Sequence, residues 1–192
     1  MHSLAPKLRP AVFLDRDGTI IEEVGYLREP SRVKLIPGAA GGIRRLNERG
    51  VSVVVVTNQA GVGRGYFPET AVAEVHVELA RQLASTGGGA RWDAIYYCPH
   101  HPDDACDCRK PGPGMFRRAA AEHGLDLRRS FVVGDKVSDV RAGALLGCRT
   151  VLVLTGYGIE EAERARAAGL TPDHVACDLG AAADWVLCQL GS

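Results

Sequence analysis

Three cysteines and a histidine stand close together in the sequence, as Cys98-x-His100 followed by Cys106-x-Cys108. Three thiolates and one imidazole complete the tetrahedral coordination that Zn²⁺ prefers, and a site with no open position is structural rather than catalytic. A disulfide between Cys106 and Cys108 would be strained, which favours the metal. The spacing leaves two alternatives open: His101 in place of His100 as the ligand, and three thiols that bind no metal.

Two basic residues, Arg109 and Lys110, follow these cysteines directly. A lysine taken alone is most simply a solvated surface charge. A loop that zinc holds at residues 98–108 would instead fix where both side chains point, while the metal itself takes no part in a reaction. We therefore expect Lys110 to be aimed at an anion.

A second group of residues that could do chemistry is Asp15-Arg16-Asp17-Gly18-Thr19, which follows a short apolar run. Side chains alternate along an extended segment, so Asp15 and Asp17 face the same way while Arg16 points elsewhere. Two carboxylates this close repel each other unless a cation lies between them or one holds a proton, so the pair predicts a bound Mg²⁺, a proton donor, or both. A surface turn is the simpler alternative, but the position after a predicted strand favours chemistry.

The elements that must position these residues can be predicted from apolar patterns. Runs rich in Val, Ile and Leu predict buried parallel strands at residues 11–15, 51–58, 93–98, 130–135 and 150–156, with a sixth at 174–178. Helical patterns lie between them and at the end of the chain, at residues 37–50, 68–87, 113–124, 136–147, 159–170 and 181–190. This alternation predicts an α/β fold, a doubly wound, Rossmann-like parallel sheet with helices on both faces.

Polar residues fall where four of the predicted strands end: Asp15, Thr57, Cys98 and Asp135. In open α/β sheets, ligands bind at the edge formed by the carboxyl ends of the strands. We therefore expect the site to be assembled at that edge from several loops.

The composition limits the class of protein. With 192 residues the chain is long enough for one domain, residues 1–192, with a core of its own. Lys and Arg together number 23, as do Asp and Glu, so no excess of positive charge indicates a nucleic-acid partner.

Residues 1–10 contain no apolar stretch typical of a signal peptide, and no run approaches the roughly 20 apolar residues of a membrane span, so we expect a cytoplasmic protein. Cysteines stay reduced in that compartment, and Cys148, Cys177 and Cys188 are expected to be buried as small apolar residues.

The stretch DRDGT at residues 15–19 resembles the first motif of the haloacid dehalogenase (HAD) superfamily of phosphotransferases. The other family motifs follow in order, in VVVVTNQ, CRKPGPGM and GDKVSD, so that the resemblance covers about residues 11–158. It implies that Asp15 is the nucleophile and that Asp17 acts as general acid and then as general base. Thr57 and Lys110 would stabilise the phosphoryl group in transit.

The resemblance also implies a magnesium site. A phosphate monoester is a dianion, so an anionic nucleophile needs positive charge beside it before it can approach. Mg²⁺ prefers oxygen ligands, and the implied set is the carboxylates of Asp15 and Asp135 and the backbone carbonyl of Asp17. Asp139, one helical turn past Asp135, is expected to orient Lys136 or the waters of the metal.

The segments between these motifs are too short for a cap domain, so a HAD core without a cap and with a zinc-binding loop is expected. Two branches of the superfamily combine such a core with such a loop. The sequence looks most like the heptose-1,7-bisphosphate 7-phosphatase branch, through DRDGTI, VVVVTNQAGVGRG, IYYCPHHP and CDCRKPGPGM, and the alternative is the histidinol-phosphate phosphatase branch. The first implies removal of the 7-phosphate of D-glycero-D-manno-heptose 1,7-bisphosphate on the way to nucleotide-activated heptose and lipopolysaccharide.

By the same resemblance, the substrate would be a small phosphorylated sugar. The charge balance and the apolar runs predict no nucleic-acid or membrane partner, and a monomer is expected for a core without a cap. Arg109 would recognise the phosphate that is not cleaved, because a planar guanidinium binds phosphate bidentately. The implied substrate-binding residues are Glu23, Val24, Gly25, Tyr26, Asn58, Gln59, Ala60, Arg109 and Lys136.

A zinc-stabilised binding domain without catalytic activity is a more remote alternative, because zinc loops of this kind also occur in binding modules. Such a module would have no reason to gather Asp15, Asp17 and Asp135 at one edge of a sheet, and its basic residues should cluster on one face.

Overall fold

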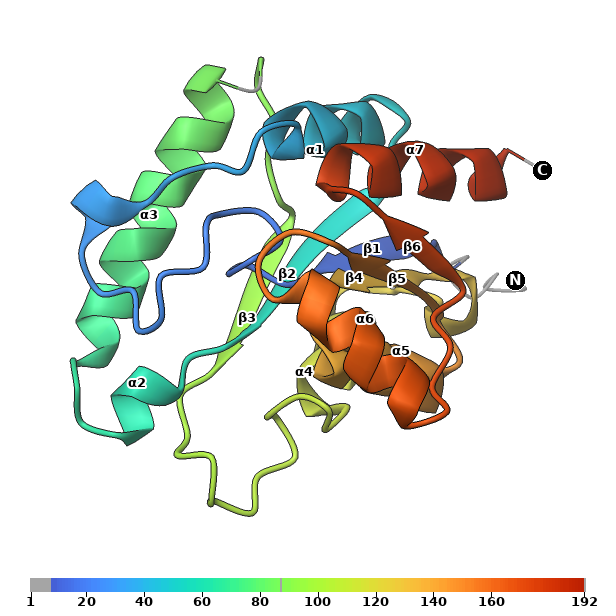
Figure 1. The fold of residues 1–192 in the computed structure, drawn as a ribbon. Helices are drawn as coiled ribbons and strands as arrows, with labels where there is room; N and C mark the ends of the chain where they lie inside the picture. Colours follow the sequence, from blue (N-terminus) through green and yellow to red (C-terminus); the bar gives the residue numbers. More distant parts are fainter. Residues whose placement is uncertain (1–7, 87, 192) are drawn as a thin grey trace, which may run out of the picture.

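A six-stranded, wholly parallel sheet forms the centre of the computed structural model, which describes residues 8–86 and 88–191 (Figure 1). The strand order is β3-β2-β1-β4-β5-β6, so the chain builds outward from β1 in both directions. The expected doubly wound fold is confirmed, and each strand lies within three residues of its predicted bounds. The strands are β1 (Ala11–Leu14), β2 (Ser52–Asn58), β3 (Ala94–Cys98), β4 (Phe131–Gly134), β5 (Arg149–Val153) and β6 (His174–Ala176).

Helices cover both faces of the sheet (Figure 1). One face carries α1 (Ala39–Glu48), α3 (Glu69–Thr86) and α7 (Leu179–Leu190), and the other carries α4 (Gly114–His123) and α5 (Val137–Leu146), with α6 (Gly158–Ala167) packed beside α5. The predicted end of one helix at residue 87 lies outside the described residues. The short elements η1 (Pro30–Arg32), α2 (Ala60–Gly63) and η2 (Leu127–Arg129) were not predicted, because a single turn leaves no periodic pattern in the sequence.

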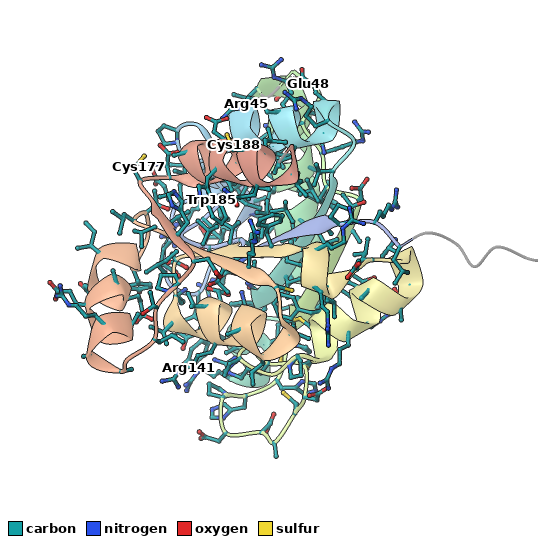
Figure 2. The ribbon with its side chains drawn as sticks, turned by 90° about the vertical axis from the view of Figure 1, so that its right-hand side faces the viewer. Arg45, Glu48, Arg141, Cys177, Trp185 and Cys188 are labelled. Atoms are coloured by element: carbon teal, nitrogen blue, oxygen red, sulfur yellow. The ribbon has the colours of Figure 1, made fainter. Side chains whose placement is uncertain are left out.

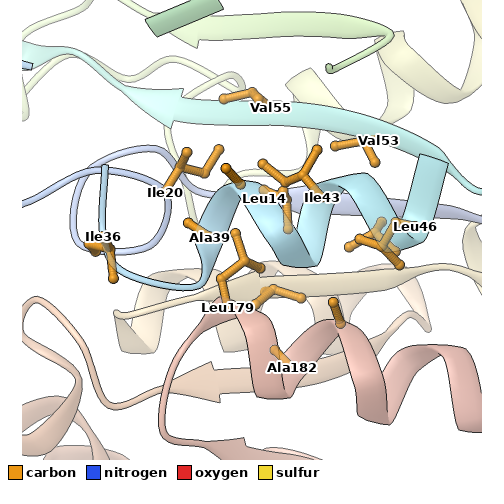
Figure 3. Packing of buried hydrophobic residues seen from close by; sticks show 14 of the residues in the cluster. Leu14, Ile20, Ile36, Ala39, Ile43, Leu46, Val53, Val55, Leu179 and Ala182 are labelled. Carbon is orange, nitrogen blue, oxygen red and sulfur yellow. The ribbon is translucent and has the colours of Figure 1, made fainter. Parts of the chain in front are cut away.

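The alternation of side chains along each strand divides the core into two layers. In β1, Val12 and Leu14 join the cluster under α1, α3 and α7, whereas Ala11 and Phe13 join the cluster under α4 and α5. Figure 3 shows the first cluster, in which Ile43 of α1 lies between the sheet and α7. Burial of a side chain such as Ile43 contributes roughly 1.5–3 kcal/mol to the stability of the fold. The core therefore fixes the position of β1 and of Asp15, which follows it.

The point where the strand order reverses lies at β1, between β2 and β4. A crevice forms there at the carboxyl edge, because the connections leave β1 and its neighbours toward opposite sides. The chain from β1 to β2 holds only η1 and α1, so no cap domain is inserted, as expected. Within the described residues, no helix is both long enough and apolar enough to cross a membrane.

The expectation for the scattered cysteines is only partly correct. Cys148 is buried, but Cys177 and Cys188 are exposed near and on α7 (Figure 2). The reason is that β6 is the last strand of the sheet and that Cys188 falls on the outer side of α7, so the core reaches neither residue.

Candidate active site and metal-binding loop

A cavity of about 340 Å³ opens at the carboxyl edge of the sheet, beside β1 and β2. Asp15 and Asp17 line it from the end of β1, Thr57 from β2, and Lys110 from the loop before α4. The sequence-predicted catalytic residues are therefore brought together in one place. A larger cavity, about 730 Å³, lies along β3 and α4 and contains none of these four residues.

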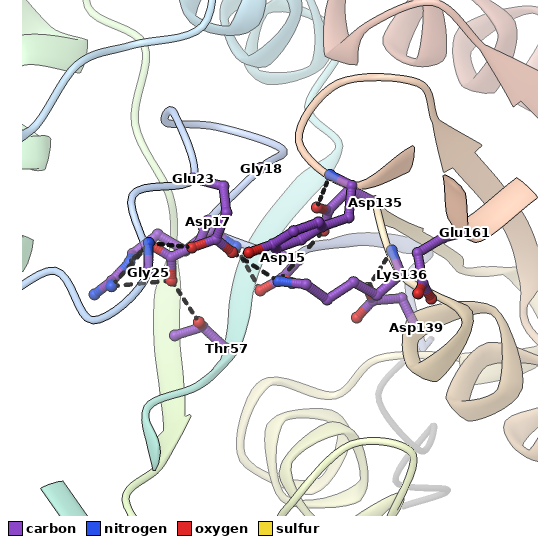
Figure 4. A network of polar contacts seen from close by, with 12 residues as sticks. Asp15, Asp17, Gly18, Glu23, Gly25, Thr57, Asp135, Lys136, Asp139 and Glu161 are labelled. Carbon is purple, nitrogen blue, oxygen red and sulfur yellow. Dashed lines mark hydrogen bonds and ion pairs between the residues drawn. The ribbon is translucent and has the colours of Figure 1, made fainter. Parts of the chain in front are cut away.

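Three carboxylates, those of Asp15, Asp135 and Asp139, offer oxygens within 4.8 Å of one another (Figure 4). Gly18 and Gly156 flank Asp135 so closely that a Cβ on either would collide with its Oδ2. Both glycines also have positive φ, 80° and 57°, which other residues rarely adopt. The backbone is thus wrapped tightly around this carboxylate.

Asp135 has the most distant counter-charge of this group, because Lys136 Nζ lies 3.9 Å from its Oδ1, whereas Lys110 Nζ lies within 2.9 Å of Asp15 and Asp139. Its Oδ2 accepts a hydrogen bond from the backbone N–H of Tyr157 at 2.9 Å, but its Oδ1 is buried without a hydrogen-bond partner. Burial, with the nearby charge of Asp15, raises the pKa of Asp135 to about 8. A buried carboxylate oxygen without a partner, next to a second carboxylate, fits the oxygen ligation that a divalent cation such as Mg²⁺ prefers.

Lys110 lies at the centre of the site and is almost completely buried. Its Nζ is 2.9 Å from Asp15 Oδ1 and 2.6 Å from Asp139 Oδ1, and it donates to the carbonyl of Val56 at 2.7 Å. Burial alone would lower the pKa of Lys110, but the two carboxylates together raise it. The same ammonium, with Lys136, lowers the pKa of Asp15 against the effect of burial, so Asp15 stays ionised.

Asp139 contacts Lys136, as expected, and has a second partner that was not expected. Its Oδ2 accepts from the backbone N–H of Lys136 at 3.2 Å, which caps α5, and its Oδ1 pairs with Lys110. The side chain of Lys136 turns to Glu23, at 2.9 Å. Asp139 therefore orients the lysine from the third motif.

The carboxylate of Asp17 accepts hydrogen bonds from several side chains, of which Figure 4 labels Thr57. Its Oδ2 accepts from Gln59 Nε2 at 2.9 Å and from Thr57 Oγ1 at 3.5 Å, and Arg16 donates to its Oδ1. Gln59 also donates to Thr57 Oγ1 at 2.9 Å. Both ends of the Gln59 amide are thus used inside the protein.

Most of the substrate residues implied by the resemblance line the same cavity. Tyr26 is half exposed and packs edge to face on Tyr66, with the ring centroids 4.8 Å apart. Asn58 uses its side-chain amide on the backbone of Lys110, accepting from its N–H and donating to its carbonyl. Val24 does not line the cavity, because it packs against the hydrophobic core. Those that do are Glu23, Gly25, Tyr26, Asn58, Gln59, Ala60, Arg109 and Lys136.

Two arginines at this cavity, Arg109 and Arg64, form no ion pair with an acid among the residues that the structure describes. Arg109 has a buried Nη1 without a hydrogen-bond partner, and Arg64 lines the cavity from the end of α2. Arg64 was missed in the sequence, where it stands in a glycine-rich stretch that lacks the pattern of a nucleotide-binding loop. A pair of guanidinium groups beside a cavity is suited to an anionic part of a ligand.

The predicted metal ligands converge at the other end of the Lys110 loop. Cys98, His100, Cys106 and Cys108 each offer one ligand atom, all within 4.8 Å of one another. His100 Nδ1 lies 3.1 Å from Cys108 Sγ, and Cys98 Sγ lies 3.6 Å from Cys106 Sγ. His101 turns away, and its Nδ1 accepts from the backbone of Asp103. The donor set and its spacing suit tetrahedral zinc and favour His100 over His101 as the ligand.

Known proteins resemble this chain over almost its whole length. A HAD-hydrolase-like family model matches residues 107–182. The D-glycero-D-manno-heptose-1,7-bisphosphate 7-phosphatase of Thermosynechococcus vestitus is 40% identical over 192 residues, which cover 95% of this chain and 97% of that protein. The D-glycero-beta-D-manno-heptose-1,7-bisphosphate 7-phosphatase of Escherichia coli is 40% identical over 190 residues, which cover 94% of this chain and 90% of that protein. The crystal structure of D,D-heptose 1,7-bisphosphate phosphatase from B. bronchiseptica, complexed with magnesium and phosphate, has a TM-score of 0.86 at 37% identity and covers 94% of this chain and 99% of that one.

Proposed function

Because the chain belongs to the D-glycero-D-manno-heptose-1,7-bisphosphate 7-phosphatase family of HAD-like hydrolases, we propose that it removes the 7-phosphate of D-glycero-D-manno-heptose 1,7-bisphosphate. The observation that carries the proposal is 40% identity over 95% of the chain to a phosphatase of that name. The protein is thus a phosphoric monoester hydrolase, and the interpretation as a binding domain without catalytic activity is wrong. Its product would continue toward nucleotide-activated heptose.

In this proposal, the phosphate to be cleaved lies next to Asp15 and to a bound Mg²⁺. Asp15, Asp135 and the backbone carbonyl of Asp17 would hold Mg²⁺, which is present in the related B. bronchiseptica structure. When bound, Mg²⁺ would neutralise part of the phosphate charge. Lys110 adds a fixed positive charge beside Asp15, and the hydroxyl of Thr57, which lines the same cavity, would donate to a phosphoryl oxygen.

The reaction would proceed in two steps. An ionised oxygen of Asp15 attacks phosphorus in line, the bond to the sugar oxygen breaks, and protonated Asp17 gives its proton to that oxygen. Water then attacks the phosphorus of the aspartyl phosphate, Asp17 takes a proton from the water, and inorganic phosphate leaves with Asp15 restored. Support for these roles comes from the low pKa of Asp15 and from the position of both carboxylates at one cavity.

The phosphate that is not cleaved would bind at the guanidinium groups of Arg109 and Arg64. The unpartnered Nη1 of Arg109 supports this assignment. The sugar would lie between these groups and the segment 23–26, where Tyr26 offers a half-exposed ring and Glu23 is fixed by Lys136.

We further propose that Zn²⁺ occupies the cluster of Cys98, His100, Cys106 and Cys108 and has a structural role. The four protein ligands would fill all four positions of a tetrahedral Zn²⁺ and leave none for a substrate. A monomeric state and a cytoplasmic location stay predictions.

A phosphate-release assay with Mg²⁺ tests the assignment. The α and β anomers of the heptose 1,7-bisphosphate are compared with histidinol phosphate, and the Asp15→Asn variant is the blank. We expect kcat/KM for one heptose anomer to exceed that for histidinol phosphate by about a hundredfold, equivalent to about 2.7 kcal/mol in transition-state binding. Preference for histidinol phosphate would refute the substrate but leave the phosphatase chemistry intact.

A further inference from the structure

Arg16, the residue between the two catalytic aspartates, is among the largest completely buried side chains of the protein. Its guanidinium donates to Asp17 Oδ1 from Nη2 at 3.0 Å and from Nε at 3.2 Å, and Nη2 forms an ion pair with Oδ2 at 3.0 Å. Nη2 also donates to Gln59 Oε1 at 3.0 Å. These donors face the protein interior, and Arg16 does not line the catalytic cavity, so the residue is not placed to bind the substrate phosphate.

The far side of the same guanidinium meets a histidine from another part of the chain. Nη1 of Arg16 lies 3.1 Å from Nε2 of His76, which stands on α3. An arginine can only donate, so Nε2 must accept, and the ring proton must reside on Nδ1. Burial, with the charge of Arg16, lowers the pKa of His76 to about 3, so the ring remains a neutral acceptor at working pH.

His76 is itself held in place. It is 9% exposed, and its ring packs edge to face on Tyr97 of β3 with the centroids 5.8 Å apart. The contacts thus form a continuous chain from α3 through Arg16 to the Asp17 carboxylate.

We propose that Arg16 and His76 are positioning residues, which together hold the Asp17 carboxylate in the orientation that protonates the leaving oxygen. The inference rests on the proposed function, in which Asp17 is the general acid. A catalytic group must be held within about half an ångström of its productive place, and a carboxylate at the end of a rotatable side chain achieves this only through its neighbours. Loss of the acceptor on α3 would free one end of the guanidinium to shift and carry the carboxylate with it.

The choice of leaving group separates a misplaced Asp17 from general damage to the fold, because general damage would slow the reaction of every substrate alike. A sugar alkoxide needs a proton as it departs, whereas 4-nitrophenolate leaves readily without one. A misplaced Asp17 should therefore slow transfer from a sugar phosphate much more than transfer from 4-nitrophenyl phosphate.

The experiment measures single-turnover rates of phosphoryl transfer to the Mg²⁺-loaded enzyme from heptose 1,7-bisphosphate and from 4-nitrophenyl phosphate. The variants are His76→Leu, which removes the acceptor, and His76→Gln, whose amide oxygen can replace Nε2. Leu79→Val on the same helix is the control for packing, and Asp17→Asn is the reference for a lost acid. We expect His76→Leu to lower the sugar phosphate rate by about 10- to 100-fold, with KM and the aryl phosphate rate nearly unchanged, and His76→Gln to restore most of the loss.

Equal losses on both substrates, or a His76→Gln variant no better than His76→Leu, would overturn the proposal. Should His76→Leu fail to fold, His76→Met takes its place in the same comparison. If the wild-type enzyme hydrolyses the aryl phosphate but not the heptose bisphosphate, the proposed substrate fails. The ratio is then measured with whichever alkyl phosphate is hydrolysed, so the positioning role is still decided.

Discussion

Lys110 carries its charge in surroundings that would be unfavourable for a lysine without partners. Its Nζ has oxygens of Asp15, Asp139 and Val56 within 2.9 Å and is almost completely shielded from water. Removing one partner of a buried ion pair is costly, because the charges that remain are left without compensation. We therefore expect the lysine to contribute both to the reaction and to the stability of the site.

Replacing Lys110 by Met should reveal both contributions. We expect Lys110→Met to lower kcat by at least about a thousandfold and to reduce stability by about 3–5 kcal/mol, or roughly 10 °C in Tm. Thermal unfolding and the phosphate-release assay measure the two effects. The matched control is Lys34→Met, which removes an exposed pair with Glu22 and should change stability by less than about 0.5 kcal/mol. An unchanged Tm for Lys110→Met would contradict this account of the buried pair.

The buried histidine at position 76 should make stability depend on pH. Its pKa in the folded protein is about 3, below the ordinary 6.5, so the unfolded chain takes up the proton first. This contribution to stability is complete above pH 6.5 and is lost as the pH falls toward 3. Between pH 6 and 4, the wild type should lose up to about 1.4 kcal/mol per pH unit more than His76→Gln, as measured by urea unfolding. Parallel pH curves for the two proteins would show that His76 titrates normally.

At the scale of elements, two separate parts of the structure fix the backbone position of Lys110. The metal-binding loop ends two residues before it, and Asn58 at the end of β2 holds its backbone through two hydrogen bonds of 3.0 and 3.2 Å. The loop thus links the edge strand β3 to the catalytic centre. Without a metal, the three thiols and the imidazole would lie close together with no ion to bind them. We therefore expect the order of the loop to depend on bound metal.

Removal of the loop metal should therefore impair catalysis at a distance. We expect Cys106→Ser, or extraction of zinc with a chelator followed by excess Mg²⁺, to lower kcat by about 10- to 100-fold and to lower the Tm. Returning Zn²⁺ to the extracted wild type should restore activity. The control variant, Cys177→Ser, replaces an exposed cysteine outside the cluster and should behave as the wild type. Full activity in metal-free protein would contradict a positioning role for the loop.

At the scale of the molecule, the side chains of the proposed site all come from one chain. One chain supplies every residue that the resemblance implies for catalysis, and we predict a monomer of about 20.5 kDa. Light scattering at micromolar concentration should give this mass, and specific activity should not change on dilution. A mass near twice this value, with activity lost on dilution, would show that the site depends on a partner copy.

The sequence predicts those parts of this molecule that depend on local patterns. The strands follow from their apolar runs, and Asp15, Thr57 and Asp135 follow from their places at strand ends. The contact of Arg16 with His76 could not be foreseen, because it joins residues 60 positions apart through the packing of α3 on the sheet. The partner of Asp139 and the core position of Val24 depend likewise on tertiary contacts, for which spacing carries no signal.

The reacting groups and the selecting groups stand on different parts of the chain. Asp15, Thr57 and Asp135 lie at the ends of core strands, whereas Glu23 and Tyr26, which we expect to select the sugar, lie on a loop. In evolutionary terms, a duplicated gene could change one of these loops and acquire a new phosphate ester as substrate while inheriting a working reaction centre. The loop of residues 98–110 should have less freedom to diverge, since it carries side by side Arg109, which we propose selects a phosphate, and Lys110, which we propose takes part in catalysis. A lineage that discarded its cysteines would first have to secure that lysine by other means.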